Sequence, residues 1–98
     1  MPYIDPLERV KLDNSIDSLI CVIRAGLENK SLQDIAGNLN YTISRLCGGI
    51  INGKVTYSKI AVITGVLENV KQEFYRRVAV PYEESKIKEN KDIKEYEN

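Results

Sequence analysis

The chain has 98 residues, of which 43% are hydrophobic and 29% are charged, and its 14 basic residues balance its 14 acidic residues. These values indicate one folded domain over residues 1–98, exclude an intrinsically disordered chain, and argue against a protein that coats nucleic acid. With neither a signal peptide nor an apolar run long enough to span a membrane, we expect a cytoplasmic protein with no membrane partner.

The first predicted elements are an extended arm over residues 1–11 and an amphipathic helix over residues 13–27. Two prolines and mixed charges favour the arm, with room for a short turn of helix after Asp5. The apolar residues of the helix recur at helical spacing, namely Leu12, Ile16, Leu19, Ile20, Ile23 and Leu27.

A capping pattern opens the next segment, because the Ser31 hydroxyl precedes the Asp34 carboxylate by three residues. We expect one or two turns of helix there, a break at residues 37–38, and a second main helix over residues 39–51. The glycine pair at residues 48–49 is costly inside a helix. Close helix packing, an early helix end and close approach of a ligand all remain open as explanations.

The longest predicted helix begins at Thr56 or Ser58, and Pro81 is expected to end or kink it. Its apolar stripe is formed by Ile60, Ile63, Leu67, Val70, Phe74 and Val78. The charged segment 82–98 is expected to form a short helix and then fray over residues 91–98. The prediction is therefore an all-α bundle of three main helices with short extra helical segments, and self-association into a homo-oligomer would help so small a chain.

Arginine and tyrosine side chains meet at the carboxyl end of the longest helix. Arginine offers a planar fork for phosphate and tyrosine offers a ring for a base, so Tyr75, Arg76 and Arg77 have the chemistry of a nucleotide site. The alternative is a solvated helix face in which the arginines pair with Glu73 or Glu83.

A second polar group lies where the helix over residues 39–51 is expected to begin. Unpaired backbone N–H groups at such a terminus bind anions, which makes Asn40, Tyr41 and Arg45 candidate ligand-binding residues. The alternative is that Asn38 caps the helix and the Tyr41 ring packs.

Four further side chains would hydrogen-bond a ribose or an adenine edge if they faced the arginines, namely Tyr57, Tyr82, Glu83 and Glu84. The alternative is that acidic residues just after the proline are solvated helix caps. With no histidine and only Cys21 and Cys47, both within apolar helical patterns that favour buried thiols, we predict no metal site, no cofactor and no catalytic residues.

Several short sequence motifs of this chain are informative when they are taken together. They are Leu39-Asn40-Tyr41-x-Ile43-x-Arg45-Leu46, Tyr57-x-x-Ile60, Gly65-Val66-Leu67-Glu68, Phe74-Tyr75-Arg76-Arg77-Val78-x-x-Pro81-Tyr82-Glu83 and Lys86-Ile87-x-Glu89-Asn90-x-Asp92. Over residues 2–93 the chain resembles a family of small uncharacterised bacteriophage proteins. The resemblance implies a phage protein in the cytoplasm of an infected bacterium.

Some small phage proteins of this profile act as sponges, which bind a host immune nucleotide signal without cleaving it. By analogy we expect an anionic nucleotide-like ligand, either a cyclic ADP-ribose isomer or ADP-ribose conjugate of Thoeris, or else a cyclic oligonucleotide of CBASS. Three rival functions stay open: a helical module that inhibits a host protein, a small DNA-associated protein, and an enzyme that cleaves the same signals.

Overall fold

The computed structural model describes residues 3–97, which form helices and connecting turns with no strand. The chain divides by its internal contacts into unit 1, residues 1–54, and unit 2, residues 55–98, and each is described by itself. The predicted all-α class with three main helices is confirmed, while the assignment of residues 1–98 to a single domain stays a prediction.

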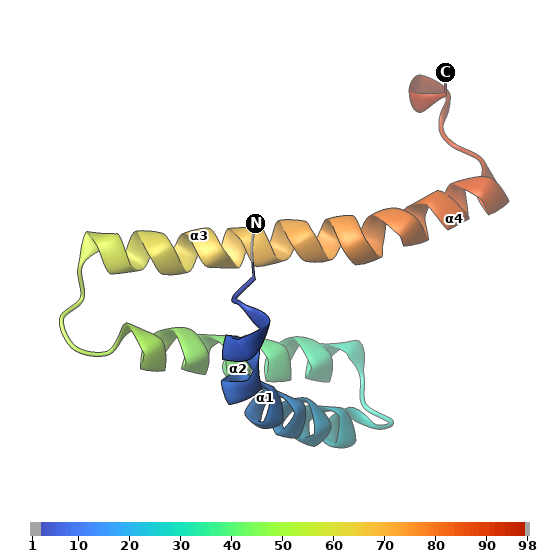
Figure 1. Ribbon diagram of the computed structural model, residues 1–98. Helices are drawn as coiled ribbons and strands as arrows, with labels where there is room; N and C mark the ends of the chain where they lie inside the picture. Colours follow the sequence, from blue (N-terminus) through green and yellow to red (C-terminus); the bar gives the residue numbers. More distant parts are fainter. Residues whose placement is uncertain (1–2, 98) are drawn as a thin grey trace. The chain divides into compact units, whose positions relative to one another are not determined.

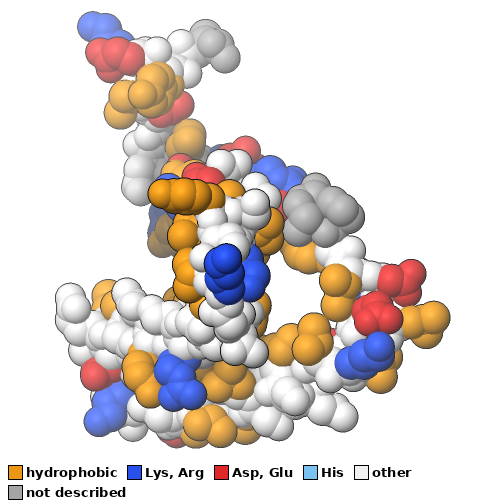
Figure 2. Space-filling view, turned by 90° about the vertical axis from the view of Figure 1, so that its left-hand side faces the viewer, with side chains coloured by type: hydrophobic (Ala, Val, Ile, Leu, Met, Phe, Trp, Pro, Cys, Tyr) orange, Lys and Arg blue, Asp and Glu red, His pale blue; other side chains and the backbone are white. Residues whose placement is uncertain are grey.

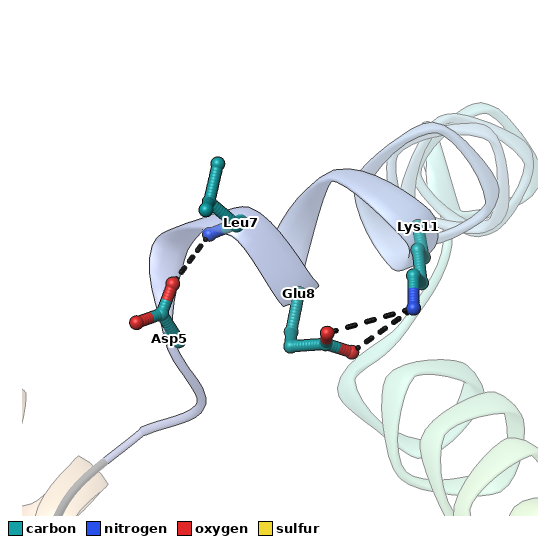
Figure 3. Close-up of polar contacts among 4 residues, drawn as sticks. All are labelled: Asp5, Leu7, Glu8 and Lys11. Atoms are coloured by element: carbon teal, nitrogen blue, oxygen red, sulfur yellow. Dashed lines mark hydrogen bonds and ion pairs between the residues drawn. The ribbon is translucent and has the colours of Figure 1, made fainter.

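Helix α1 in unit 1 spans Pro6–Leu27 and begins earlier than expected. The Asp5 side chain accepts a hydrogen bond from the Leu7 backbone N–H at 2.9 Å, and one turn later Lys11 pairs with Glu8 at 3.3 Å (Figure 3). Proline suits this position because its fixed φ is helical and its missing N–H would be unpaired in the first turn anyway. The predicted extended arm is therefore wrong for residues 6–11, and residues 1–2 lie outside the described part.

Helix α2 spans Leu32–Ile51 without interruption. The predicted cap is confirmed as a capping box, in which the Ser31 hydroxyl accepts from the Asp34 N–H and the Asp34 carboxylate accepts from the Ser31 N–H at 3.0 Å. The predicted break at residues 37–38 is wrong. Asn38 instead donates from its side chain to the Asp34 carbonyl oxygen at 2.8 Å, which ties it into the helix.

Short turns end both helices of unit 1 where the sequence predicted. Asn29 has φ +61° after α1, and Gly53 has φ +79° after α2, which is a conformation that glycine adopts without strain. Helices α1 and α2 contact each other within this unit.

Unit 2 is one long helical stretch (Figure 1). Helix α3, Tyr57–Phe74, begins at Thr56, whose hydroxyl accepts from the Lys59 N–H at 3.2 Å. It continues through a π-helical turn, η1, Tyr75–Ala79, into helix α4, Val80–Asn90, and a short 3₁₀ turn, η2, follows at Lys94–Tyr96. The predicted Thr56 cap is confirmed.

The π-turn explains how the helix passes Pro81. Proline lacks an N–H and its ring collides with the carbonyl four residues earlier in a regular α-helix. Here the Val80 N–H bonds the Tyr75 carbonyl oxygen, five residues back, and Pro81 falls in the first turn of α4, where proline is tolerated. Pro81 thus changes the hydrogen-bond register without ending the helix.

Burial is sparse throughout. None of residues 3–97 is buried, and large apolar side chains of all four α-helices remain exposed (Figure 2). The predicted burial of both thiols is not observed, because Cys21 is exposed and Cys47 is half-buried. Each unit, taken by itself, leaves much apolar helix surface uncovered.

Replacing Pro81 by alanine should remove the reason for the π-turn. We expect Pro81→Ala to restore α-helical bonding across residues 75–81 and to stabilise the helix by about 1 kcal/mol or more, below the ~3 kcal/mol that proline costs in an uninterrupted helix. Thermal unfolding followed by circular dichroism measures the gain, and hydrogen-bond couplings in NMR identify the acceptor of the Val80 N–H.

Glu84→Ala is the matched control, since it changes an exposed side chain in the same turn and keeps the proline. If Val80 still bonds Tyr75 in Pro81→Ala, the π-turn has another cause.

Candidate functional site

The arginines of the longest helix gather around one carboxylate. Glu73, at the end of α3, accepts a hydrogen bond from the Arg76 guanidinium, and the Arg77 Nε lies 3.3 Å from the same Glu73 oxygen. The Glu73 side chain is 24% exposed, whereas those of Arg76 and Arg77 are 65% and 63% exposed. The two guanidinium groups are thus held near the same carboxylate, and most of each arginine side chain is exposed to solvent.

These contacts change the acidity of the carboxylate. The hydrogen bond from Arg76 is the largest cause that lowers the pKa of Glu73 below 4.5; partial burial opposes it, and the hydrogen bond from Arg77 and the charges of both arginines support it. Glu73 therefore stays ionised at neutral pH and offsets one of the two positive charges. An anion that displaced the Glu73 carboxylate would meet both guanidinium groups.

Tyr75 belongs to a different hydrogen-bonded group. Its hydroxyl donates to the Glu83 carboxylate at 2.7 Å, across the π-turn and into α4. This hydrogen bond is the main cause that raises the pKa of Tyr75 above 10.0, and the negative charge of Glu83 and partial burial add to it. The contact fixes the tyrosine hydroxyl and leaves the ring exposed.

The two groups leave the helix in different directions. Glu73 lies three and four residues before Arg76 and Arg77, which is pairing distance on a helix, but only two residues before Tyr75, which it does not face. Arg76 and Arg77 bind Glu73, while Tyr75 binds Glu83. The three predicted residues are therefore adjacent in the sequence but belong to two separate groups of contacts, one around Glu73 and one at Glu83.

The candidates of unit 1 lie along the middle of α2. Arg45 donates to the Tyr41 hydroxyl at 3.3 Å, with its guanidinium carbon 6.0 Å from the ring centre, and Asn40 accepts from the Ser44 hydroxyl at 3.2 Å. Since α2 begins at Leu32, the expected helix terminus at residue 39 is wrong, and backbone N–H groups there are paired in the helix. Unpaired N–H groups were the reason to expect an anion site at this point, and the uninterrupted helix removes that reason.

A shallow hollow of about 330 Å³ adjoins these residues and is lined by Tyr41, Ser44, Arg45, Gly48 and Gly49. A Cβ added at either glycine would meet nothing within 4 Å. Close packing within this structure therefore does not account for the glycine pair, and approach of another group to bare backbone stays open.

The remaining candidates are spread along unit 2. Tyr57 is the first residue of α3 and is 93% exposed. Tyr82, in α4, carries the Lys86 ammonium 5.5 Å from its ring centre. Within residues 3–97, no hydrogen bond or ring contact joins either tyrosine to Arg76 or Arg77, and the binding roles of all these residues stay predictions.

Residues 3–97 contain neither a cluster of metal ligands nor a helix suited to span a membrane. No group of histidine, cysteine or acidic residues there could hold a metal ion. In the same part of the chain, no helix is both long enough and apolar enough to cross a membrane.

Comparison with known proteins places this chain in a family. The model of a domain of unknown function, DUF6899, matches residues 1–93. The chain belongs to the DUF6899 family. Neither the curated proteins nor the solved structures gave a match. Every candidate residue lies within the part of the chain that the DUF6899 domain covers.

Glu73 is the residue whose importance sequence reasoning underrated. It was expected only as one of two alternative partners of the arginines, although its spacing of three and four residues from Arg76 and Arg77 is the standard pairing distance on a helix. The structure selects Glu73 for both arginines and leaves Glu83 to Tyr75.

The acidity of Glu73 is directly measurable. Because its folded pKa lies below 4.5, the ion pairs stabilise the fold at higher pH and are lost as the pH falls through that lowered value. NMR titration of the carboxyl carbon should give a pKa below 4.5, and Arg76→Ala should raise it. Lys71→Ala is the control, since Lys71 pairs with Glu68; an equal effect of both variants would refute the assignment.

The pKa of Tyr75 is shifted in the opposite direction from that of Glu73. Its folded pKa lies above 10.0, so the hydrogen bond to Glu83 contributes below pH 10 and is lost as the pH rises through the raised value. Ring NMR signals should report a lower pKa for Tyr75 in Glu83→Gln and an unchanged one in Glu84→Gln. A lower value in Glu84→Gln alone would contradict the contact.

Proposed function

We propose that this protein binds and sequesters an anionic nucleotide-like signal of host immunity during phage infection, without cleaving it. The observation that carries the proposal is the pair of exposed guanidinium groups of Arg76 and Arg77 around one carboxylate oxygen of Glu73. The phage setting comes from the sequence resemblance. The ligand class, a cyclic ADP-ribose isomer, an ADP-ribose conjugate or a cyclic oligonucleotide, comes from the analogy with other small phage proteins.

The arginine pair suits a phosphate because carboxylate and phosphate oxygens accept from a guanidinium fork in the same way. A phosphate that replaced the Glu73 carboxylate would meet two cations already held near each other, so little side-chain conformational entropy would be lost on binding. Arg45, beside the Tyr41 ring, is the second candidate for a phosphate contact.

The base of the ligand would stack on tyrosine. The Tyr75 ring is exposed and its hydroxyl is fixed by Glu83, which lowers the entropic cost of presenting the ring. Since Tyr75 does not face Arg77 on the same helix, we propose that one copy supplies the arginines and a second copy supplies the ring. Tyr41 and Tyr82 are further stacking candidates, and Asn40, Tyr57 and Glu83 are candidates for the base or ribose edges.

Sequestration requires affinity without chemistry. The proposed residues bind phosphates, rings and hydroxyl groups. The hydroxyl of Tyr75 lies beside the Glu83 carboxylate, but this contact raises the pKa of Tyr75 and so disfavours its nucleophilic phenolate form. The exposed apolar surface favours one rival, a helical module that binds a host protein.

Calorimetry with intact cyclic ADP-ribose isomers, ADP-ribose conjugates and cyclic dinucleotides tests the proposal. We expect one of them to bind and to be recovered unchanged by chromatography. Arg77→Ala should weaken binding about tenfold or more, as loss of a charge-assisted hydrogen bond does. Glu73→Gln should strengthen binding, because it releases both arginines from their competing anion.

Glu68→Gln is the matched control, since it removes the same charge one turn and a half earlier on α3 and should change affinity little. No binding by any of these ligands, together with stoichiometric capture of one host protein, would favour the protein-binding rival. Cleavage of a ligand without added metal would replace sequestration by catalysis.

A further inference from the structure

The hydrogen bond between Tyr75 and Glu83 depends on the register of the helix that carries both residues. An α-helix turns by about 100° per residue, so side chains eight residues apart point about 80° away from each other. The π-turn at Tyr75–Ala79 is closed by a hydrogen bond five residues back, which inserts one residue into the helical repeat. Eight residues across this turn therefore complete about two turns, as seven do in an α-helix, and Glu83 falls in line with Tyr75.

An α-register over the same segment would turn Glu83 towards the arginine pair, which consists of Arg76 and Arg77. Without the inserted residue, the side chain two turns before Glu83 is that of Arg76. By the same count, Glu84 would fall in line with Arg77. Of these two carboxylates, only that of Glu84 lies in line with the pair in the observed register. Within residues 3–97, the ion pairs of both arginines are with Glu73.

A further carboxylate at the arginine pair lowers its affinity for an anion. The pair carries two positive charges, of which the Glu73 carboxylate offsets one. The 2.7 Å contact between Tyr75 and Glu83 shows that a glutamate bridges two turns of this helix to reach a long side chain. In the α-register, Glu83 would reach Arg76 in the same way and offset the second charge. A phosphate would then have to displace two carboxylates instead of one.

Pro81 decides between the two registers. Proline has no N–H, and in an α-register its ring would collide with the Arg77 carbonyl, four residues earlier. The π-turn avoids this collision, because the Val80 N–H bonds the Tyr75 carbonyl oxygen, five residues back. Pro81 therefore excludes the register in which Glu83 would reach the arginine pair.

We propose that Pro81, through the π-turn, keeps the Glu83 carboxylate off the arginine pair, so that the pair stays open to an anion. Pro81 is a positioning residue, since it acts only by committing Glu83 to the Tyr75 hydroxyl. The proposal rests on the proposed function for the identity of the ligand, whereas the competition between carboxylate and ligand applies to any phosphate anion.

Pro81→Ala tests the proposal, with inorganic pyrophosphate as the probe. In the full-length variant the Val80 N–H should bond the Arg76 carbonyl oxygen, and the pKa of Tyr75 should fall towards 10.0 because Glu83 no longer aligns with it. Pyrophosphate, titrated by NMR of the arginine Nε–H signals, should bind about two- to fivefold more weakly than to the wild type, which is the effect of one exposed ion pair.

A second substitution separates the register from a general loss of charge. Pro81→Ala/Glu83→Gln should regain the lost affinity, and Glu83→Gln should raise affinity more in the Pro81→Ala background than in the wild type. Pro81→Ala/Glu89→Gln is the matched control, since Glu89 pairs with Lys86 and its substitution removes the same charge away from the arginine pair. Circular dichroism verifies that all variants stay helical.

Three results would overturn the proposal: an α-register in Pro81→Ala with undiminished pyrophosphate affinity, equal rescue by Glu83→Gln and Glu89→Gln, or a Val80 N–H that stays bonded to Tyr75 in Pro81→Ala. Absence of pyrophosphate binding by the wild type would equally overturn it. A nucleotide that fails to bind, while pyrophosphate affinity follows the register, would refute the proposed ligand class and leave the role of Pro81 intact.

Discussion

Backbone hydrogen bonding along the helices is what each described element depends on, because no side chain among residues 3–97 is buried. Each long helix begins at a side chain that accepts a backbone N–H: Asp5 for α1, Ser31 for α2 and Thr56 for α3. Such caps contribute about 1 kcal/mol each, and helices gain most of their stability from packing of an apolar face. Each unit, taken by itself, leaves its apolar helix faces exposed and so lacks most of that stabilisation.

The local chemistry of the chain was largely predictable. Hydroxyl caps at Ser31 and Thr56 and the helix ends at Leu27 and Ile51 follow from residue type and spacing, since each acts within a few residues. The errors arose where a breaking residue was overridden by its neighbours. Asn38 joins α2 through its own side chain, and Pro81 is accommodated by a change in hydrogen-bond register.

The candidate site was predictable in its residues but not in its contacts. Composition and sequence proximity suggested a single face of tyrosine and arginine, whereas side-chain direction on the helix separates Tyr75 from Arg77. Which of two nearby carboxylates pairs with the arginines depends on the turn between them, and the π-turn lies between Glu73 and Glu83. Residue type alone contains no information on that turn.

The π-turn at Tyr75–Ala79 also sets how this helix tolerates changes in length. A turn closed by a bond five residues back contains one residue more than an α-turn, so deletion of one residue there leaves the preceding and following helices in nearly their original phase. The same deletion in the middle of α3 would rotate everything after it by about 100° and move the arginines around the helix. Residues 75–79 are thus the segment of this helix in which deletion of one residue, together with replacement of Pro81, would keep both faces aligned.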